Sequence, residues 1–119
     1  MIYGEVTSDR EAIVPIDIIG ATETLTIEAV IDTGFTEYLC LPQHIIDQLD
    51  LNFVEVTQAL LADGSIVDFD IYEAEANWGG HPKDVLVHSS QGGALIGMSL
   101  LYGCKVAIDV VDGGTVSIV

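Results

Sequence analysis

Cationic residues are scarce in this chain. Only Arg10, Lys83 and Lys105 stand against 19 acidic residues, and the formal net charge is -16. Because proteins gain much of their affinity for nucleic acids from lysine and arginine, this balance excludes nucleic acid as an expected partner. Binding to anionic membrane surfaces is disfavoured for the same reason.

Cysteine is scarce as well. Cys40 and Cys104 are too few and too far apart for a disulfide framework, and neither belongs to a metal-type pair. Both lie in apolar stretches typical of strands, so we interpret them as small core residues. The three histidines, His44, His81 and His88, show no ligand spacing and are expected at the surface or at edges. The sequence therefore predicts no metal and no cofactor.

The sequence also lacks a long apolar run. Its longest uncharged stretch, residues 85–104, contains His88, two serines, a glutamine and two adjacent glycines, which is typical of loops and strands rather than a membrane span. The N-terminus has neither a basic start nor an apolar core segment, so we expect no signal peptide, no membrane partner and a cytoplasmic location. At 119 residues, half of them apolar, the chain is predicted to form a single domain over residues 1–119.

The most informative segment is Asp32-Thr33-Gly34, which follows an apolar run. Residues 25–31 are typical of a strand that enters the core, so Asp32 is expected at its end, where a carboxylate needs hydrogen bonds or a shared proton. Gly34 allows backbone N–H groups to approach closely, and the Thr33 hydroxyl can bond to a neighbouring loop. The same tripeptide is also good turn chemistry, so a catalytic interpretation depends on the other motifs.

Strand patterns cover most of the chain. Strands are expected at residues 2–6, 12–19, 25–31, 38–41, 53–60, 66–78, 84–88, 105–110 and 115–119. Pro42 is well placed in the first turn of a helix that continues to about Leu49. The pattern predicts an all-β barrel or sandwich with one or two short helices.

Two further motifs follow the aspartate in a definite order. Asp63-Gly64-Ser65 lies between strand-forming segments and predicts a hairpin turn, and Leu95-Ile96-Gly97 is an apolar run ending at a glycine before a short helical stretch. In this order the motifs resemble the retropepsin-like aspartic proteases, with Asp32-Thr33-Gly34 as the active-site loop. The other two motifs then match the flap hairpin and the hydrophobic-hydrophobic-Gly motif that supports the loop. The resemblance covers nearly the whole chain and implies a retropepsin-like closed barrel.

The resemblance implies a homodimer, because the chain has one Asp loop and no internal repeat that supplies a second. Each copy would donate one Asp32, and the two carboxylates would share one proton, as is general for aspartic proteases. One carboxylate would act as base on a water that attacks the peptide bond, and the other as acid. Thr33 would link the two loops across the twofold axis, and Gly34 would admit the substrate backbone. The hairpin would close over an extended peptide or protein substrate.

Two departures from the family pattern stand out. Phe35 follows the Asp-Thr-Gly motif, where viral members commonly have Ala, and the flap tip Asp63-Gly64-Ser65 is not Gly-rich. The acidic tip and the negative field of the chain favour basic peptides as substrates.

Two alternatives remain open at this point. One is a non-catalytic dimeric binding module with the same fold, and the other is an unrelated, monomeric acidic β-domain. The chain ends bear on the assembly, since residues 2–6 and 115–119 are both β-prone. The resemblance implies that they pair between subunits, and the alternative is that they close their own barrel.

Overall fold

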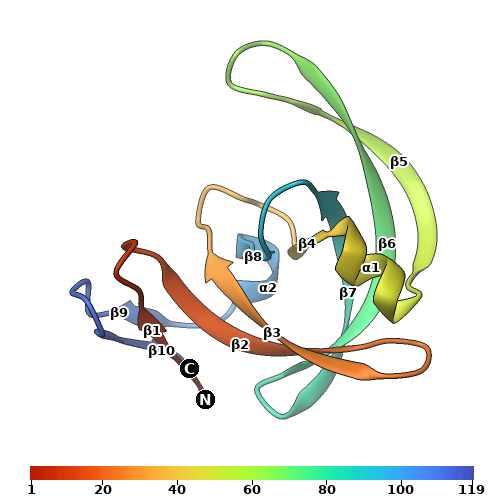
Figure 1. Ribbon diagram of the computed structural model, residues 1–119. Helices are drawn as coiled ribbons and strands as arrows, with labels where there is room; N and C mark the ends of the chain where they lie inside the picture. The colour runs from red at the N-terminus through yellow and green to blue at the C-terminus, as the bar shows by residue number, and fades with distance from the viewer.

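The computed structural model describes residues 1–119. It shows ten strands, which form one continuous sheet, and two short helices (Figure 1). The elements are β1 (Ile2–Val6), β2 (Ala12–Ile19), β3 (Thr24–Ile31), β4 (Leu39–Pro42), α1 (Gln43–Leu49), β5 (Asn52–Leu60), β6 (Ile66–Trp78), β7 (His81–Ser90), β8 (Leu95–Ile96), α2 (Met98–Leu101), β9 (Val106–Ile108) and β10 (Thr115–Ile118). The predicted all-β class is confirmed. Neither helix has the length and apolar character needed to cross a membrane.

Strand boundaries agree closely with the periodicity of the sequence. β1, β2 and β6 have the predicted bounds. β7 begins at His81, earlier than the predicted start at Asp84, because Gly79 and Gly80 form a tight turn that lets the ladder between β6 and β7 start at the pair Trp78 and His81. β9 ends at Ile108, short of the predicted residue 110.

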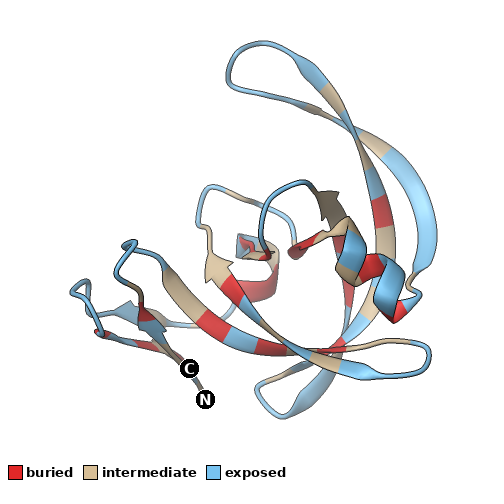
Figure 2. Ribbon diagram, in the orientation of Figure 1, coloured by how far each residue is buried: buried red, intermediate tan, exposed pale blue.

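The core is built from the apolar face of each alternating strand. In β2, Val14, Ile16 and Ile18 are buried, whereas Pro15 between them is exposed. Figure 2 shows that buried residues gather in the body of the molecule and that the far end of the β5–β6 hairpin is exposed. Buried apolar area stabilises this body, and the hairpin extends from it.

The two predicted core cysteines have different positions. Cys40 is buried in β4, as predicted, but Cys104 is half-buried in the loop between α2 and β9 rather than in a strand. The apolar stretch that suggested a strand at Cys104 is occupied by α2 and the turn that follows it.

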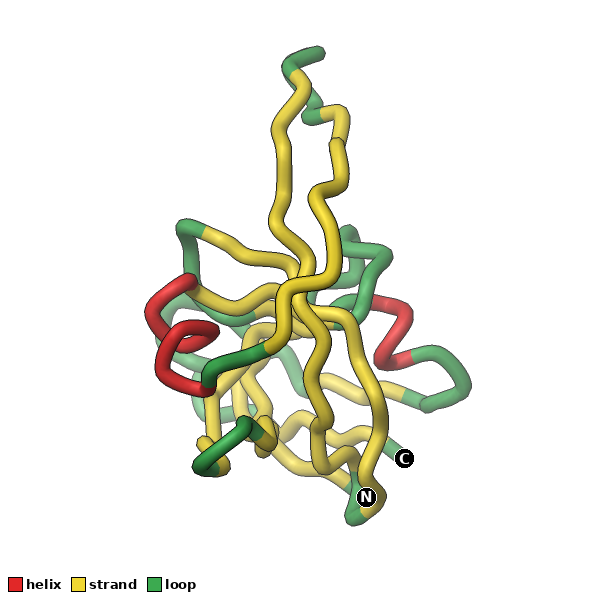
Figure 3. The backbone as a smooth tube through the Cα atoms, turned by 90° about the vertical axis from the view of Figure 1, so that its right-hand side faces the viewer, coloured by secondary structure: helices red, strands yellow, loops and turns green.

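The sheet order is β5-β6-β7-β4-β8-β3-β2-β1-β10-β9, with a further pairing between β6 and β2. Six strands therefore form a closed ring of pairings, in the order β6, β7, β4, β8, β3, β2 and back to β6. The whole sheet does not close as the sequence had suggested, because β5 and β9 remain at its two open edges. The edge of β5 stays open because the β5–β6 hairpin extends away from the body instead of folding back onto it (Figure 3).

The two chain ends pair with each other inside one chain. β1 runs antiparallel to β10, with Ile2 opposite Ile118, and β10 pairs with β9 on its other side. Both strands thus have their neighbours within one chain, as in the alternative to pairing between subunits, although they do not close a barrel. In Figures 1 and 3 the termini lie together, at the end of the molecule opposite the hairpin tip.

Candidate functional site

Asp32 begins the loop of residues 32–38 that joins β3 to β4. Its backbone N–H donates to Ile96 O at 2.9 Å, and its side-chain Oδ1 accepts a hydrogen bond from the Gly34 N–H at 2.9 Å. The side chain is half-buried, and the structure has no fully buried charged residue. The loop thus stabilises the carboxylate and leaves it open to solvent. Thr33 and Gly34 are both exposed beside it.

The loop is fixed by β8, which lies between β3 and β4. β8 pairs in parallel with β3 and antiparallel with β4, so strands joined directly by the loop are held one strand apart. Behind the loop, the N–H of Gly97 donates to Tyr38 O at 3.0 Å and that of Met98 donates to Phe35 O at 2.8 Å. The predicted motif at residues 95–97 is therefore brought directly against the Asp32 loop.

Gly97 is packed against the loop too closely for any side chain. A Cβ at this position would lie 2.0 Å from Glu37 O and 2.6 Å from Phe35 Cδ2. Real Cβ atoms essentially never approach other atoms so closely, so glycine is required for steric reasons. Ser99, in α2, also binds the Asp32 loop, because its Oγ donates a hydrogen bond to Thr36 O at 2.5 Å.

The hairpin turn at residues 61–65 is closed by Asp63. Its Oδ1 accepts hydrogen bonds from the Ser65 N–H at 2.9 Å and the Ser65 Oγ at 2.6 Å, and Gly64 adopts φ 87°. These hydrogen bonds, the one from the Ser65 side chain first, lower the pKa of the Asp63 carboxyl. The tip is therefore an exposed, negatively charged turn closed by its own hydrogen bonds. In Figure 1 the turn lies at the far end of the β5–β6 hairpin, away from the loop between β3 and β4 that begins at Asp32.

His88 lies between the loop and the hairpin, although the sequence had suggested a surface or edge position. Its ring packs edge-on against Phe35, with ring centroids 5.6 Å apart, and against Phe69 of β6, at 6.2 Å. The Nδ1 atom is buried and has no partner. Burial lowers the pKa of the imidazole, and the negative charge of Glu37 opposes this in part.

No sequence signal identified His88 as part of the site. In β7 the buried residues are Val85 and Val87, so the alternation of side chains places His88 on the opposite face. From the sequence pattern, that face is predicted to be exposed to solvent. That face is covered only because the Asp32 loop and the hairpin, distant in sequence, both reach it.

Cys40 lies near the candidate aspartate. Burial and, to a smaller extent, the negative charge of Asp32 raise the pKa of the Cys40 thiol to about 11. The thiol therefore stays protonated and uncharged at neutral pH.

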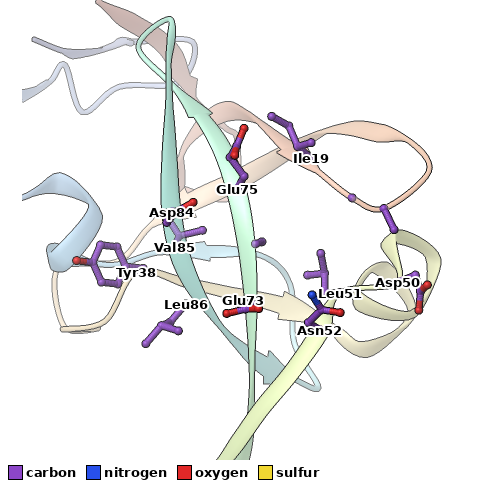
Figure 4. A pocket seen from close by; sticks show the side chains of 13 residues that line it. Ile19, Tyr38, Asp50, Leu51, Asn52, Glu73, Glu75, Asp84, Val85 and Leu86 are labelled. Atoms are coloured by element: carbon purple, nitrogen blue, oxygen red, sulfur yellow. The ribbon is translucent and has the colours of Figure 1, made fainter.

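A cavity of about 690 Å³ lies elsewhere, on the face formed by β6, β7 and the start of β5. Figure 4 shows the acidic side chains Glu73, Glu75 and Asp84 in its lining, together with apolar side chains such as Val85 and Leu51. From the Asp32 loop only Tyr38 lines it, so the cavity is separate from the candidate site. No group of His, Cys, Asp and Glu side chains in the structure is arranged to hold a metal ion.

Comparison with solved structures supports the fold. The chain is similar to a retropepsin-like aspartic protease from Rickettsia conorii, at 17% sequence identity and a TM-score of 0.58, with 99% of this chain and 90% of that chain covered. No family model matches the chain, and no curated protein matches it. The likeness concerns the fold, which resembles a retropepsin-like protease over almost the whole chain.

Proposed function

We propose that this chain is one subunit of a homodimeric aspartic endopeptidase, with one Asp32 from each copy forming the catalytic pair. The observation that carries the proposal is the Asp32 loop. It holds a solvent-accessible carboxylate at the end of β3, supported by the Gly34 N–H and by the close packing of Gly97, within a fold of the retropepsin-like type.

The chemistry needs two such carboxylates. Two Asp32 side chains within hydrogen-bonding distance share one proton, because two negative charges so close are costly. The ionised carboxylate takes a proton from a water between them, and the oxygen of that water attacks the peptide carbonyl carbon. The protonated carboxyl gives its proton to the carbonyl oxygen. When the intermediate collapses, the C–N bond breaks and a proton passes to the leaving amine.

The other loop residues have roles in the same proposal. Thr33 is exposed beside Asp32, where its hydroxyl would reach the loop of a second copy, and Gly34 leaves space for the substrate backbone. The hairpin with Asp63-Gly64-Ser65 at its tip would close over an extended peptide and add main-chain hydrogen bonds. The charged tip favours basic peptides.

The surface proposed for the second copy is the layer of β1, β10 and β9. Exposed apolar side chains gather in and beside these strands: Met1, Tyr3, Ile108, Val110, Val111 and Val119. β9 also has an open edge, and a twofold axis can pair the same edge strand from two copies. A dimer formed here would cover this apolar surface.

The substitution Asp32→Asn tests the function. The amide keeps the size of the side chain, and its Oδ1 can still accept the Gly34 N–H, but it cannot act as the base. We expect cleavage of an unstructured protein substrate to fall roughly a hundred- to ten-thousandfold, with mass in solution and melting temperature unchanged. Asp9→Asn, the same change on an exposed turn, is the matched control.

The outcomes separate the candidate functions. A wild-type dimer that binds peptides and never cleaves them would favour the non-catalytic module, and a stable monomer would favour an unrelated β-domain. If Asp32→Asn cleaves at the wild-type rate, Asp32 is not the catalytic group.

A further inference from the structure

His88 belongs to a row of side chains on one face of the sheet. In β7 it lies opposite Ile71 of β6 and opposite Cys40 of β4. Residues paired across neighbouring strands project to the same face, so Ile71, His88 and Cys40 cross that face in line. Phe69, two residues from Ile71 in β6, shares the face.

This face is the one that meets the candidate site. The charge of Asp32 acts on the Cys40 thiol, which places Asp32 near one end of the row. Phe35, from the loop that begins at Asp32, and Phe69, from the hairpin, both contact the His88 ring. His88 therefore lies where the catalytic loop and the hairpin base come together.

The two ring nitrogens of His88 have different surroundings. Nδ1 is the one buried side-chain polar atom without a partner, so Nε2, which makes no hydrogen bond in the chain, remains accessible. A buried N–H without an acceptor is costly, so the neutral ring carries its proton on Nε2. His88 thus presents one N–H donor on a ring that packs against two aromatic rings.

We propose that His88 is a substrate-binding residue, whose Nε2–H donates a hydrogen bond to a main-chain carbonyl of the peptide held between the Asp32 loop and the hairpin. The inference rests on the proposed peptidase function and adds a residue to its binding site. A peptide backbone supplies neutral acceptors at regular spacing, and they match a neutral donor in a strongly acidic protein, which repels carboxylates.

Two substitutions separate the donor from the ring packing. His88→Phe keeps an aromatic ring between Phe35 and Phe69 and removes the donor. His88→Gln keeps a donor, because its amide nitrogen reaches the position of Nε2. His44→Phe, on the exposed side of α1, is the matched control. His88→Leu replaces the Phe variant if that variant does not fold.

We expect His88→Phe to raise KM about five- to tenfold, the value of one hydrogen bond between neutral groups, and to change kcat by less than about twofold. His88→Gln should restore KM to near the wild-type value, and above pH 7 the melting temperatures should be alike in all variants. A KM for His88→Phe equal to that of wild type would overturn the inference. Equal increases for the Phe and Gln variants would also overturn it, since packing alone would then explain both.

A binding measurement keeps this test independent of turnover. The dissociation constant of the same peptide is measured for Asp32→Asn, with and without His88→Phe. Wild-type protein that cleaves nothing contradicts the peptidase, whereas His88→Phe should still weaken peptide binding in the Asp32→Asn background. Undiminished binding there would contradict the His88 contact alone.

Discussion

At the residue scale, Gly97 leaves no room for a side chain, because the Asp32 loop occupies the place where its Cβ would lie. Gly97→Ala would force Glu37 and Phe35 away, since the new Cβ would lie 2.0 Å from Glu37 O. We expect a loss of about 1–3 kcal/mol in the free energy of unfolding and loss of peptide cleavage. Urea unfolding and the cleavage assay measure the two effects.

Gly93→Ala is the control for that substitution, because a Cβ at Gly93 meets nothing within 4 Å. It should unfold close to the wild-type urea midpoint. Equal stability of the two alanine variants would show that the loop accommodates a side chain at Gly97.

His88 gives the folded protein a pH-dependent stability. Burial lowers its pKa below the ordinary 6.5, so the unfolded chain takes up the proton first as the pH falls. The neutral His88 ring therefore contributes to stability above about pH 6.5, and this contribution is lost as the pH falls below that value. The free energy of unfolding should accordingly fall between pH 7 and 5. His88→Phe should remove this part of the pH dependence of the free energy of unfolding. Identical pH profiles for wild type and His88→Phe would contradict this.

The two thiols should differ in reactivity. Cys40 is buried with a pKa raised to about 11, so it has almost no thiolate at pH 8, whereas Cys104 is half-buried in a loop. A thiol reagent should modify one cysteine quickly in the native protein and both after unfolding. Rapid modification of Cys40, located by peptide mapping, would show that β4 opens under native conditions.

At the scale of elements, β10 is part of the core rather than a detachable arm. It lies between β1 and β9, and Val116 and Ile118 are buried. Deleting residues 115–119 should therefore unfold the chain, not release a folded monomer, because it removes two core side chains and both ladders. Circular dichroism of the truncated chain checks this, and a folded truncation would contradict it.

A single substitution in the edge strand β9 disturbs the sheet less than the deletion of β10. Lys105 and Val119 exchange both backbone hydrogen bonds, and the Asp109 N–H donates to Thr115 O. By the alternation of antiparallel ladders, the Ile108 N–H then points away from β10. Ile108→Pro should weaken the proposed dimer, measured by sedimentation, and leave the monomer folded. A dimer as tight as wild type would place the interface elsewhere.

At the scale of the whole molecule, charge opposes assembly. Each chain carries -16, so two copies carry twice that, and like charges repel across any interface. Lower pH protonates carboxylates, and salt shortens the screening length to about 10 Å near 0.1 M. We therefore expect the proposed dimer and its proposed activity to be stronger at mildly acidic pH than at pH 8, with high salt restoring part of the loss. A tight dimer that is most active at pH 8 in low salt would show that the charges lie away from the interface.

The sequence by itself determined the elements, because each depends on neighbours in the chain. Alternation fixed the bounds of β1, β2 and β6, Pro42 marked the start of α1, and Asp63-Gly64 marked the hairpin turn. The place of Asp32 at the end of a strand was predictable for the same reason. These are local preferences, and they survive in the folded protein because the tertiary contacts agree with them.

The tertiary structure alone decided what these elements meet. It inserted β8 between β3 and β4, so that Gly97 lies against the Asp32 loop, and it paired β1 with β10 in one chain. It also covered His88 with Phe35 and Phe69, although the strand period places that residue on an outer face. Such contacts join segments far apart in sequence, and the period of a strand specifies which residues share a face but not what packs on it.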